Sequence, residues 1–99
     1  MEERAQGAPG LLVVDDDPRN RLAMSALLEP LGFQLVLASS GEEAITLARS
    51  ERFSVIMVDV RMPGLDGFET VARLREDPNA KRVPIMLLSA FGSESDYAR

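Results

Sequence analysis

The sequence contains no cysteine and no histidine among its 99 residues. Without cysteine, the chain cannot form a disulfide or a zinc–thiolate site. Without histidine, it has no Ser-His-Asp hydrolase triad, no imidazole metal site and no phosphohistidine of its own. The reactive groups that remain are carboxylates, hydroxyls, lysine and arginine. Any chemistry should therefore rest on Asp or Glu, together with a hard cation that prefers oxygen ligands.

Long apolar segments and an excess of positive charge are also missing. The first ten residues lack the apolar stretch of a signal peptide, and no apolar run approaches the length of a membrane span. The 16 acidic residues outnumber the 11 basic ones, and the net charge of −5 repels the phosphates of nucleic acid and anionic lipid. We therefore expect a cytoplasmic protein that binds neither nucleic acid directly nor a membrane.

The residues that are present suffice for one small domain, with 45% of them hydrophobic. We expect residues 1–10 to be a disordered leader and residues 11–99 to form the domain. Short apolar runs that suit buried strands alternate with segments of helical periodicity. The predicted strands are residues 11–14, 33–38, 55–58 and 84–88. This alternation predicts an α/β fold, in which a parallel sheet carries helices on both faces.

Three helix starts are marked by a residue that can cap the helix, at Asp17, Ser40 and Asp66. The first helix carries apolar residues at helical spacing, which are Leu22, Ala23, Ala26, Leu27 and Leu31. The third helix is expected to bury Phe68, Val71 and Ala72. A fourth helix is predicted to begin at Ser93.

Polar residues stand at the ends of three predicted strands. The first strand ends at Asp15 and Asp16, the third at Asp59 and the fourth at Ser89. Sites in open parallel sheets form beyond the carboxyl ends of the strands, so the three carboxylates should converge if the first and third strands are neighbours. Carboxylates that are close together repel one another, and Mg²⁺ would relieve that repulsion.

Each of these features also has a simpler explanation when it is taken alone. The acidic run 15–17 could be a helix cap within a solvated loop, and Asp59 could simply end a strand. Met62, Phe68 and Phe91 are typical packing residues. The joint placement of the polar residues on successive strand ends of one sheet is what favours a functional site.

Three segments strongly resemble the response-regulator receiver family. They are Leu-Leu-Val-Val-Asp-Asp-Asp at 11–17, Val-Asp-Val-Arg-Met-Pro-Gly-Leu-Asp-Gly at 58–67 and Pro-Ile-Met-Leu-Leu-Ser-Ala at 84–90. The resemblance implies a flavodoxin-like, doubly wound parallel sheet whose strands here have the order 2-1-3-4.

The resemblance also implies a role for each matching residue. Asp59 would be the phosphoacceptor. The Mg²⁺ ligands would be Asp16, Asp59 and the backbone carbonyl of Arg61, with Asp15 acting largely through water. Ser89 would bind the phosphoryl group and move on activation, beside the small residue Ala90. The loop beneath the site would contain Met62, Pro63 and Gly67.

The function implied by the resemblance is signalling in a two-component phosphorelay. Asp59 would take a phosphoryl group from a sensor histidine kinase or a histidine phosphotransfer protein, and the added charge would change partner affinity. The domain would not be an enzyme, because it assists only its own phosphorylation and hydrolysis.

The sequence departs from the family pattern at its C-terminal end. The family has a fifth strand ending in a lysine and a fifth helix, so we expect this copy to be cut short by roughly 20 residues or more. Lys81 and Arg82 precede the fourth strand, at the wrong end to replace that lysine. Apolar surface from Met57 and residues 85–88 should then be partly uncovered, and we expect instability or self-association through this sheet face.

Two other functions remain open. The missing lysine favours a phosphorylation-silent interaction module, a pseudo-receiver. A Mg²⁺-dependent phosphatase with an Asp nucleophile ranks last, because such enzymes usually carry a second Asp two residues later, where this chain has Arg61.

Overall fold

Strands and helices alternate along the chain, as the sequence predicts. The computed structural model describes residues 10–88. Its elements, in chain order, are β1 (Gly10–Val14), α1 (Pro18–Leu28), the 3-10 turn η1 (Glu29–Leu31), β2 (Gln34–Ala38), α2 (Gly41–Ser50), β3 (Val55–Asp59), α3 (Gly67–Leu74) and β4 (Ile85–Leu88). The fourth helix, predicted from Ser93, lies outside the described residues.

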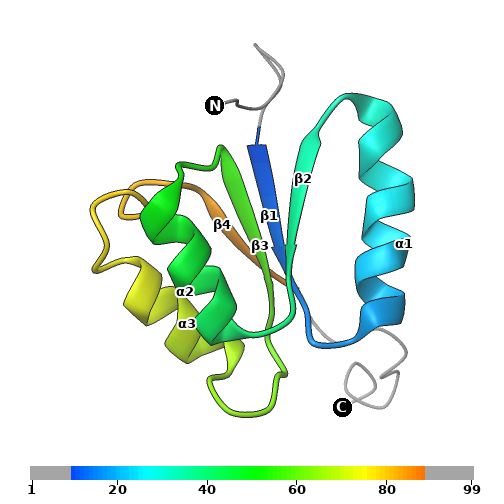
Figure 1. Cartoon of the computed structure of the whole chain (residues 1–99). Helices are drawn as coiled ribbons and strands as arrows, with labels where there is room; N and C mark the ends of the chain where they lie inside the picture. The colour runs from blue at the N-terminus through cyan, green and yellow to red at the C-terminus, as the bar shows by residue number, and fades with distance from the viewer. Residues whose placement is uncertain (1–9, 89–99) are drawn as a thin grey trace.

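The strands form one parallel sheet in the order β2-β1-β3-β4, so the predicted strand order is confirmed. Helix α1 covers one face of the sheet, and α2 and α3 cover the other (Figure 1). Because all strands run in the same direction, the residues that follow β1 and β3 emerge at the same edge of the sheet. Within the described residues, β2 and β4 are the edge strands.

Strand β1 forms the centre of the core, and all five of its residues are buried. Leu12 and Val14 face the cluster beneath α2 and α3, whereas Leu11 and Val13 pack with Met24 of α1. This explains why β1 is apolar throughout, since a strand with helices on both faces has no solvent side. Each fully buried Leu or Val side chain contributes about 1.5–3 kcal/mol to folding.

The three predicted caps begin the three helices. The side-chain oxygens of Asp17, Ser40 and Asp66 accept hydrogen bonds from backbone N–H groups in the first turns, at 2.9, 3.0 and 2.8 Å. Each bond satisfies a donor that has no partner within the helix. The local pattern therefore predicted these helix starts correctly.

Several strand limits differ by one residue from the prediction. Strand β1 begins at Gly10, the last residue of the predicted leader, because Gly10 pairs with Gln34. Strand β2 begins at Gln34 and not at Phe33, which packs against the cluster beneath α1. Strand β4 begins at Ile85, one residue after Pro84.

The predicted buried face of α3 is wrong at two of its three residues, and the apolar residues at helical spacing in α1 are not the residues that this helix buries. The expected residues of α1 point to solvent, with Leu22 and Leu27 71% and 67% exposed, and Met24 is the buried residue of that helix. In α3, Phe68 is 61% exposed and Ala72 is exposed, whereas Thr70 and Leu74 are buried with Gly67. Val71 is partly buried against the core.

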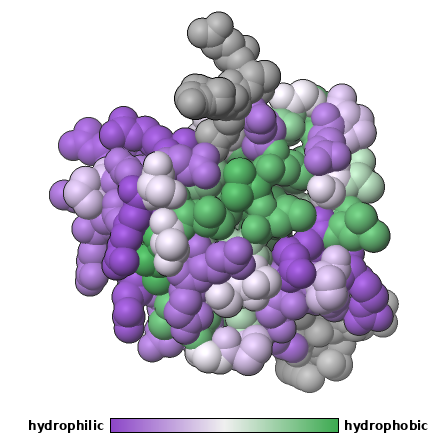
Figure 2. All heavy atoms as spheres, in the orientation of Figure 1, coloured by the Kyte–Doolittle hydropathy of each residue, from purple (hydrophilic) through white to green (hydrophobic). Residues whose placement is uncertain are grey.

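The edge strand β4 leaves part of its apolar surface uncovered, as expected. Met86 and Leu87 are 51% and 41% exposed, while Met57, Ile85 and Leu88 are half-buried and pack against the two core clusters. On the face turned toward the viewer in Figure 2, apolar side chains also reach the surface between α1 and the α2–α3 layer. No helix within residues 10–88 is long and apolar enough to cross a membrane.

Candidate functional site

Three carboxylates converge at the carboxyl ends of β1 and β3. One carboxylate oxygen from each of Asp15, Asp16 and Asp59 lies within 4.8 Å of those from the other two. Asp15 and Asp59 are buried, with 4% and 5% of their surface exposed, and Asp16 is exposed. The convergence follows from the pairing of β1 with β3, which places Val14 opposite Val58 and so sets the following residues side by side.

Backbone hydrogen bonds orient two of these carboxylates. Asp15 Oδ1 accepts a hydrogen bond from the N–H of Asp17 at 2.9 Å, and Asp59 Oδ1 accepts one from the N–H of Arg61 at 3.1 Å. In both cases the donor lies two residues after the aspartate, which is the geometry that Asp favours where a strand turns into a loop. The side chains are therefore fixed by the same turns that end their strands.

The site carries more negative charge than its surroundings compensate. Burial raises the pKa of Asp59 above its usual value, and repulsion from Asp15 and Asp16 raises it further. The hydrogen bond from the Arg61 N–H acts in the opposite direction and lowers the pKa. A cation bound among these oxygens would act against both causes of the increase and lower the pKa.

The loop after β3 is packed tightly beneath Asp59. Gly67 donates its N–H to the carbonyl of Val60 at 3.1 Å, and Val60 in turn donates to the carbonyl of Leu88 at 2.9 Å. A Cβ atom on residue 67 would lie 2.7 Å from Val60 Cα and still closer to the carbonyl oxygen of Asp59. Only glycine leaves room for this approach, so a larger residue at position 67 would displace the backbone of Asp59 and Val60 or the loop itself.

The other predicted site residues have different surroundings. Met62 is 8% exposed and packs into the core, so it supports the loop from below, while Pro63 and Arg61 are exposed. Ser89 and Ala90 lie outside the described residues. Lys81 and Arg82 precede β4 and so lie at the edge of the sheet opposite to the carboxylates, as predicted.

One residue beside the site was missed in the sequence. Arg21 of α1 donates from Nη1 to the backbone carbonyl of Asp15 at 2.7 Å. Its guanidinium group therefore holds the chain in place where β1 ends. The strand-end pattern contains no signal for this contact, because Arg21 is six residues later and on a helix.

The three carboxylates fit a magnesium ion. Mg²⁺ prefers oxygen ligands at 2.0–2.1 Å, so two directly bound oxygens are at most about 4.2 Å apart. The oxygens here lie within 4.8 Å of one another, which a small movement or one bridging water would accommodate. Asp16 is exposed, so the cluster reaches solvent at this residue, whereas Asp15 and Asp59 are buried.

Comparisons with known proteins agree with this geometry. The protein PilH of Pseudomonas aeruginosa is 34% identical over 86 residues, which are 87% of this chain and 71% of PilH. The gliding motility regulatory protein of Myxococcus xanthus is 38% identical over 89 residues, which are 90% of this chain but only 12% of that protein.

A solved structure gives the same result for the fold. The receiver domain of the sensor histidine kinase PA1611 from Pseudomonas aeruginosa, which has a magnesium ion coordinated in its active site cleft, superposes with a TM-score of 0.81. The two sequences are 32% identical, and the match covers 94% of this chain and 76% of that one. This likeness confirms the flavodoxin-like fold. The family model of the response regulator receiver domain matches residues 11–99 of the sequence. The chain therefore belongs to that family of two-component signalling domains.

Proposed function

We propose that Asp59 accepts a phosphoryl group from a phosphohistidine on a partner protein. The observation that carries this proposal is the burial of Asp59 at the end of β3, within 4.8 Å of the carboxylate oxygens of Asp15 and Asp16. A carboxylate next to two others, at the carboxyl edge of the sheet, combines a nucleophile with the ligands for a divalent cation.

Asp16, Asp59 and the backbone carbonyl of Arg61 would bind Mg²⁺ directly, and Asp15 would bind it largely through water. The ion in the PA1611 receiver supports this assignment. When bound, Mg²⁺ would neutralise the carboxylates and the charge on the phosphoryl oxygens. The raised pKa of Asp59 would then fall, and its carboxylate would remain ionised at neutral pH.

In the transfer step, a carboxylate oxygen of Asp59 forms a bond to phosphorus while the P–N bond of the phosphohistidine breaks. The electron pair of that bond stays on the imidazole nitrogen of the partner. The chain contributes by holding Asp59 still, through the Arg61 N–H on one side and the close packing of Gly67 beneath it. The product is an acyl phosphate on Asp59.

The acyl phosphate would add a charge of about −1.5 to −2 at the carboxyl edge of the sheet. We propose that the Ser89 hydroxyl binds the phosphoryl group and that Ala90 leaves space beside it. The pairing of β4 with β3 supports this proposal, because Leu88, the last described residue, lies opposite Asp59. A sensor histidine kinase or a phosphotransfer protein would be the donor, and the signal would be a changed affinity for partners in the cytoplasm. The domain would assist only its own phosphorylation and hydrolysis.

The experiment is phosphorylation of the chain with radiolabelled acetyl phosphate and MgCl₂, followed by mass spectrometry. We expect one phosphoryl group on the wild type and none on Asp59→Asn. The matched control is Asp17→Asn, which changes a neighbouring aspartate but keeps the helix cap because Asn also caps. Retained labelling of Asp59→Asn at wild-type level would exclude Asp59 as the acceptor.

A phosphorylation-silent interaction module is the second candidate. The observation that favours it is that Lys81, the one lysine within residues 10–88, lies at the edge of the sheet opposite to the carboxylates. Partner binding measured with and without beryllium fluoride separates the two functions. Equal affinity favours the silent module, whereas a clear difference favours the phosphoacceptor.

A further inference from the structure

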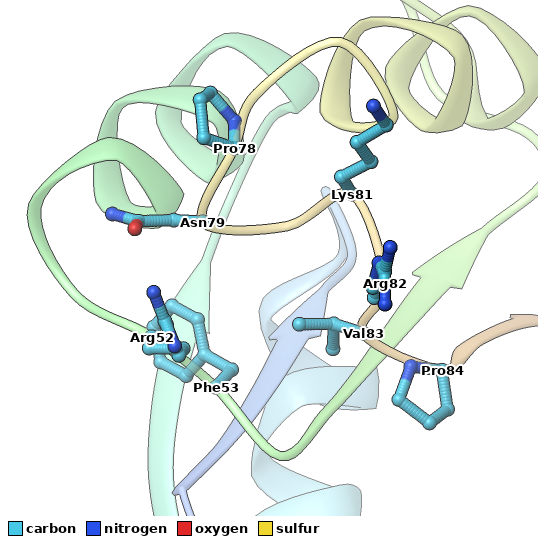
Figure 3. A pocket seen from close by; sticks show the side chains of 8 residues that line it. All are labelled: Arg52, Phe53, Pro78, Asn79, Lys81, Arg82, Val83 and Pro84. Carbon is cyan, nitrogen blue, oxygen red and sulfur yellow. The ribbon is translucent and has the colours of Figure 1, made fainter.

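A cavity of about 450 Å³ opens at the amino-terminal edge of the sheet. Arg52 and Phe53 form one wall from the loop between α2 and β3, and residues 81–84 form the facing wall from the connection that leads into β4 (Figure 3). This volume lies within the range of known ligand sites. Strand β3 separates the cavity from Asp59 by its full length of five residues, or roughly 13 Å.

The rim of the cavity is positively charged. Arg52, Lys81 and Arg82 are exposed on it, and none of its lining residues is acidic. The nearby carboxylate of Asp77 is engaged elsewhere, because it accepts a hydrogen bond from the N–H of Asn79 at 2.9 Å and lies 3.8 Å from the guanidinium of Arg49. Three cations thus gather on one edge of a chain whose net charge is −5.

The facing wall is held in place by hydrogen bonds. Arg75 Nη1 donates to the backbone carbonyls of Val83 at 2.7 Å and Lys81 at 3.0 Å. Asn79 Nδ2 donates to the carbonyls of Ala48 and Arg49 at the end of α2, at 3.2 and 3.1 Å. The backbone of the loop that carries Lys81 and Arg82 is therefore fixed relative to α2, so a ligand does not have to order this loop when it binds, which lowers the entropic cost of binding.

The floor of the cavity is apolar. Phe53 and Val83 are 4% and 8% exposed and belong to the core, and Pro84 continues this surface (Figure 3). A ligand that fits must therefore combine an apolar group with several negative charges. Separate, exposed cations bind a small anion weakly, because each cation keeps its hydration. A ligand with several linked negative charges binds more tightly, because it contacts several of the cations at the same time.

We propose that this cavity binds an acidic segment of a partner protein. An apolar side chain of the segment would rest on Phe53, Val83 and Pro84, and flanking Asp or Glu side chains would pair with Arg52, Lys81 and Arg82. The site lies at the edge opposite to Asp59, so it could hold a partner before and after phosphorylation. The proposal is independent of the function proposed for Asp59.

The test uses the 99-residue chain and a fluorescein-labelled peptide, Gly-Leu-Asp-Glu-Leu-Glu-Gly, in a fluorescence anisotropy titration. We expect saturable binding that weakens as salt increases. The double variant Lys81→Gln/Arg82→Gln should weaken binding about tenfold, the loss expected for two exposed ion pairs. The matched control is Arg19→Gln, because Arg19 is also exposed but lies at the carboxyl edge.

Three further results decide the proposal. A peptide with Asn and Gln in place of Asp and Glu should not bind, and backbone amide shifts in NMR should centre on residues 52–53 and 81–83. Equal binding by the double variant, or shifts centred on Asp15 and Asp59, would overturn it. Displacement of the peptide by an equal concentration of inorganic phosphate would also overturn it, because the site would then recognise a simple anion.

Discussion

Replacing Gly67 with alanine should lower the stability of the domain and damage the carboxylate site together. The new Cβ would lie 2.7 Å from Val60 Cα and closer still to the carbonyl oxygen of Asp59. Both neighbours are backbone atoms, so no side chain can rotate to relieve the contact, and the loop or the end of β3 must shift. Overpacking of this kind costs about 1–3 kcal/mol, which outweighs the roughly 1 kcal/mol that alanine gains over glycine in a helix.

Thermal denaturation followed by circular dichroism, with and without MgCl₂, measures both effects. For a domain of this size, a loss of 1 kcal/mol lowers Tm by about 4–8 °C. The second expected effect is a smaller increase in Tm on adding MgCl₂, because a displaced Asp59 binds the ion less tightly and the ion then stabilises the folded state less.

Gly32→Ala is the matched control for this prediction. Gly32 has φ of +96°, and a Cβ there would meet no atom within 4 Å, so alanine would strain the backbone without any contact. The strain costs about 1–2 kcal/mol, far from the carboxylates. Gly32→Ala should therefore lower Tm but keep the full effect of MgCl₂. A Gly67→Ala variant with wild-type Tm and wild-type response to MgCl₂ would refute the reasoning.

Three further predictions follow from single contacts. Ser40→Ala should lower the free energy of unfolding by about 1 kcal/mol in urea denaturation, because the cap of α2 is lost; an unchanged midpoint would contradict this. Glu43→Gln should lower the free energy of unfolding by about 0.5 kcal/mol at neutral pH, since hydrogen bonds from Ser39 lower the pKa of Glu43 below its ordinary 4.5. The difference from wild type should disappear as pH falls through that lowered pKa, and a constant difference would count against it. We expect the wild type to self-associate through β4, an edge strand within the described residues. In sedimentation velocity, Met86→Lys on β4 should suppress this association, whereas Phe68→Lys on α3 should not. A monomeric wild type would contradict the prediction.

The convergence of the carboxylates could be predicted because it depends on few rules. Each strand could be recognised as a short apolar run, and parallel strands bring their carboxyl ends to one edge of the sheet. Because β1 and β3 are neighbours, Asp15 and Asp59 therefore lie close together. The helix starts at Asp17, Ser40 and Asp66 were predictable for a different reason, since each cap bonds to its own first turn and needs no distant partner.

The buried faces of the helices could not be predicted from periodicity. In residues 22–28 of α1 only Ser25 is polar, so apolar side chains surround the helix and the pattern selects no face. In α3 the buried face includes Thr70, whose hydroxyl donates to the carbonyl of Asp66 at 2.7 Å and so is satisfied within the helix. A polar residue buried in this way gives no apolar signal.

The basic cavity could not be predicted from the sequence either, although two of its cationic residues, Lys81 and Arg82, were identified there. Arg52 and Phe53 are about thirty positions away from Lys81 and Arg82, and no strand rule joins them. They lie side by side because Asn79, in the connection that leads into β4, donates hydrogen bonds to two backbone carbonyls at the end of α2. The sequence showed only that Lys81 and Arg82 are at the wrong end of β4 to serve Asp59.

The burial of β1 and β3 stabilises the hydrophobic core but destabilises the carboxylates at the ends of the same strands. The burial that packs Val14 and Val58 completely also carries Asp15 and Asp59 out of water. Because the folded-state pKa of Asp59 is raised, its contribution to stability is present below the unfolded pKa and is lost as pH rises through the folded pKa. At neutral pH the site therefore works against the fold. A divalent cation bound to the same oxygens would reverse this effect, so the strand pairing that builds the core and such an ion should stabilise each other.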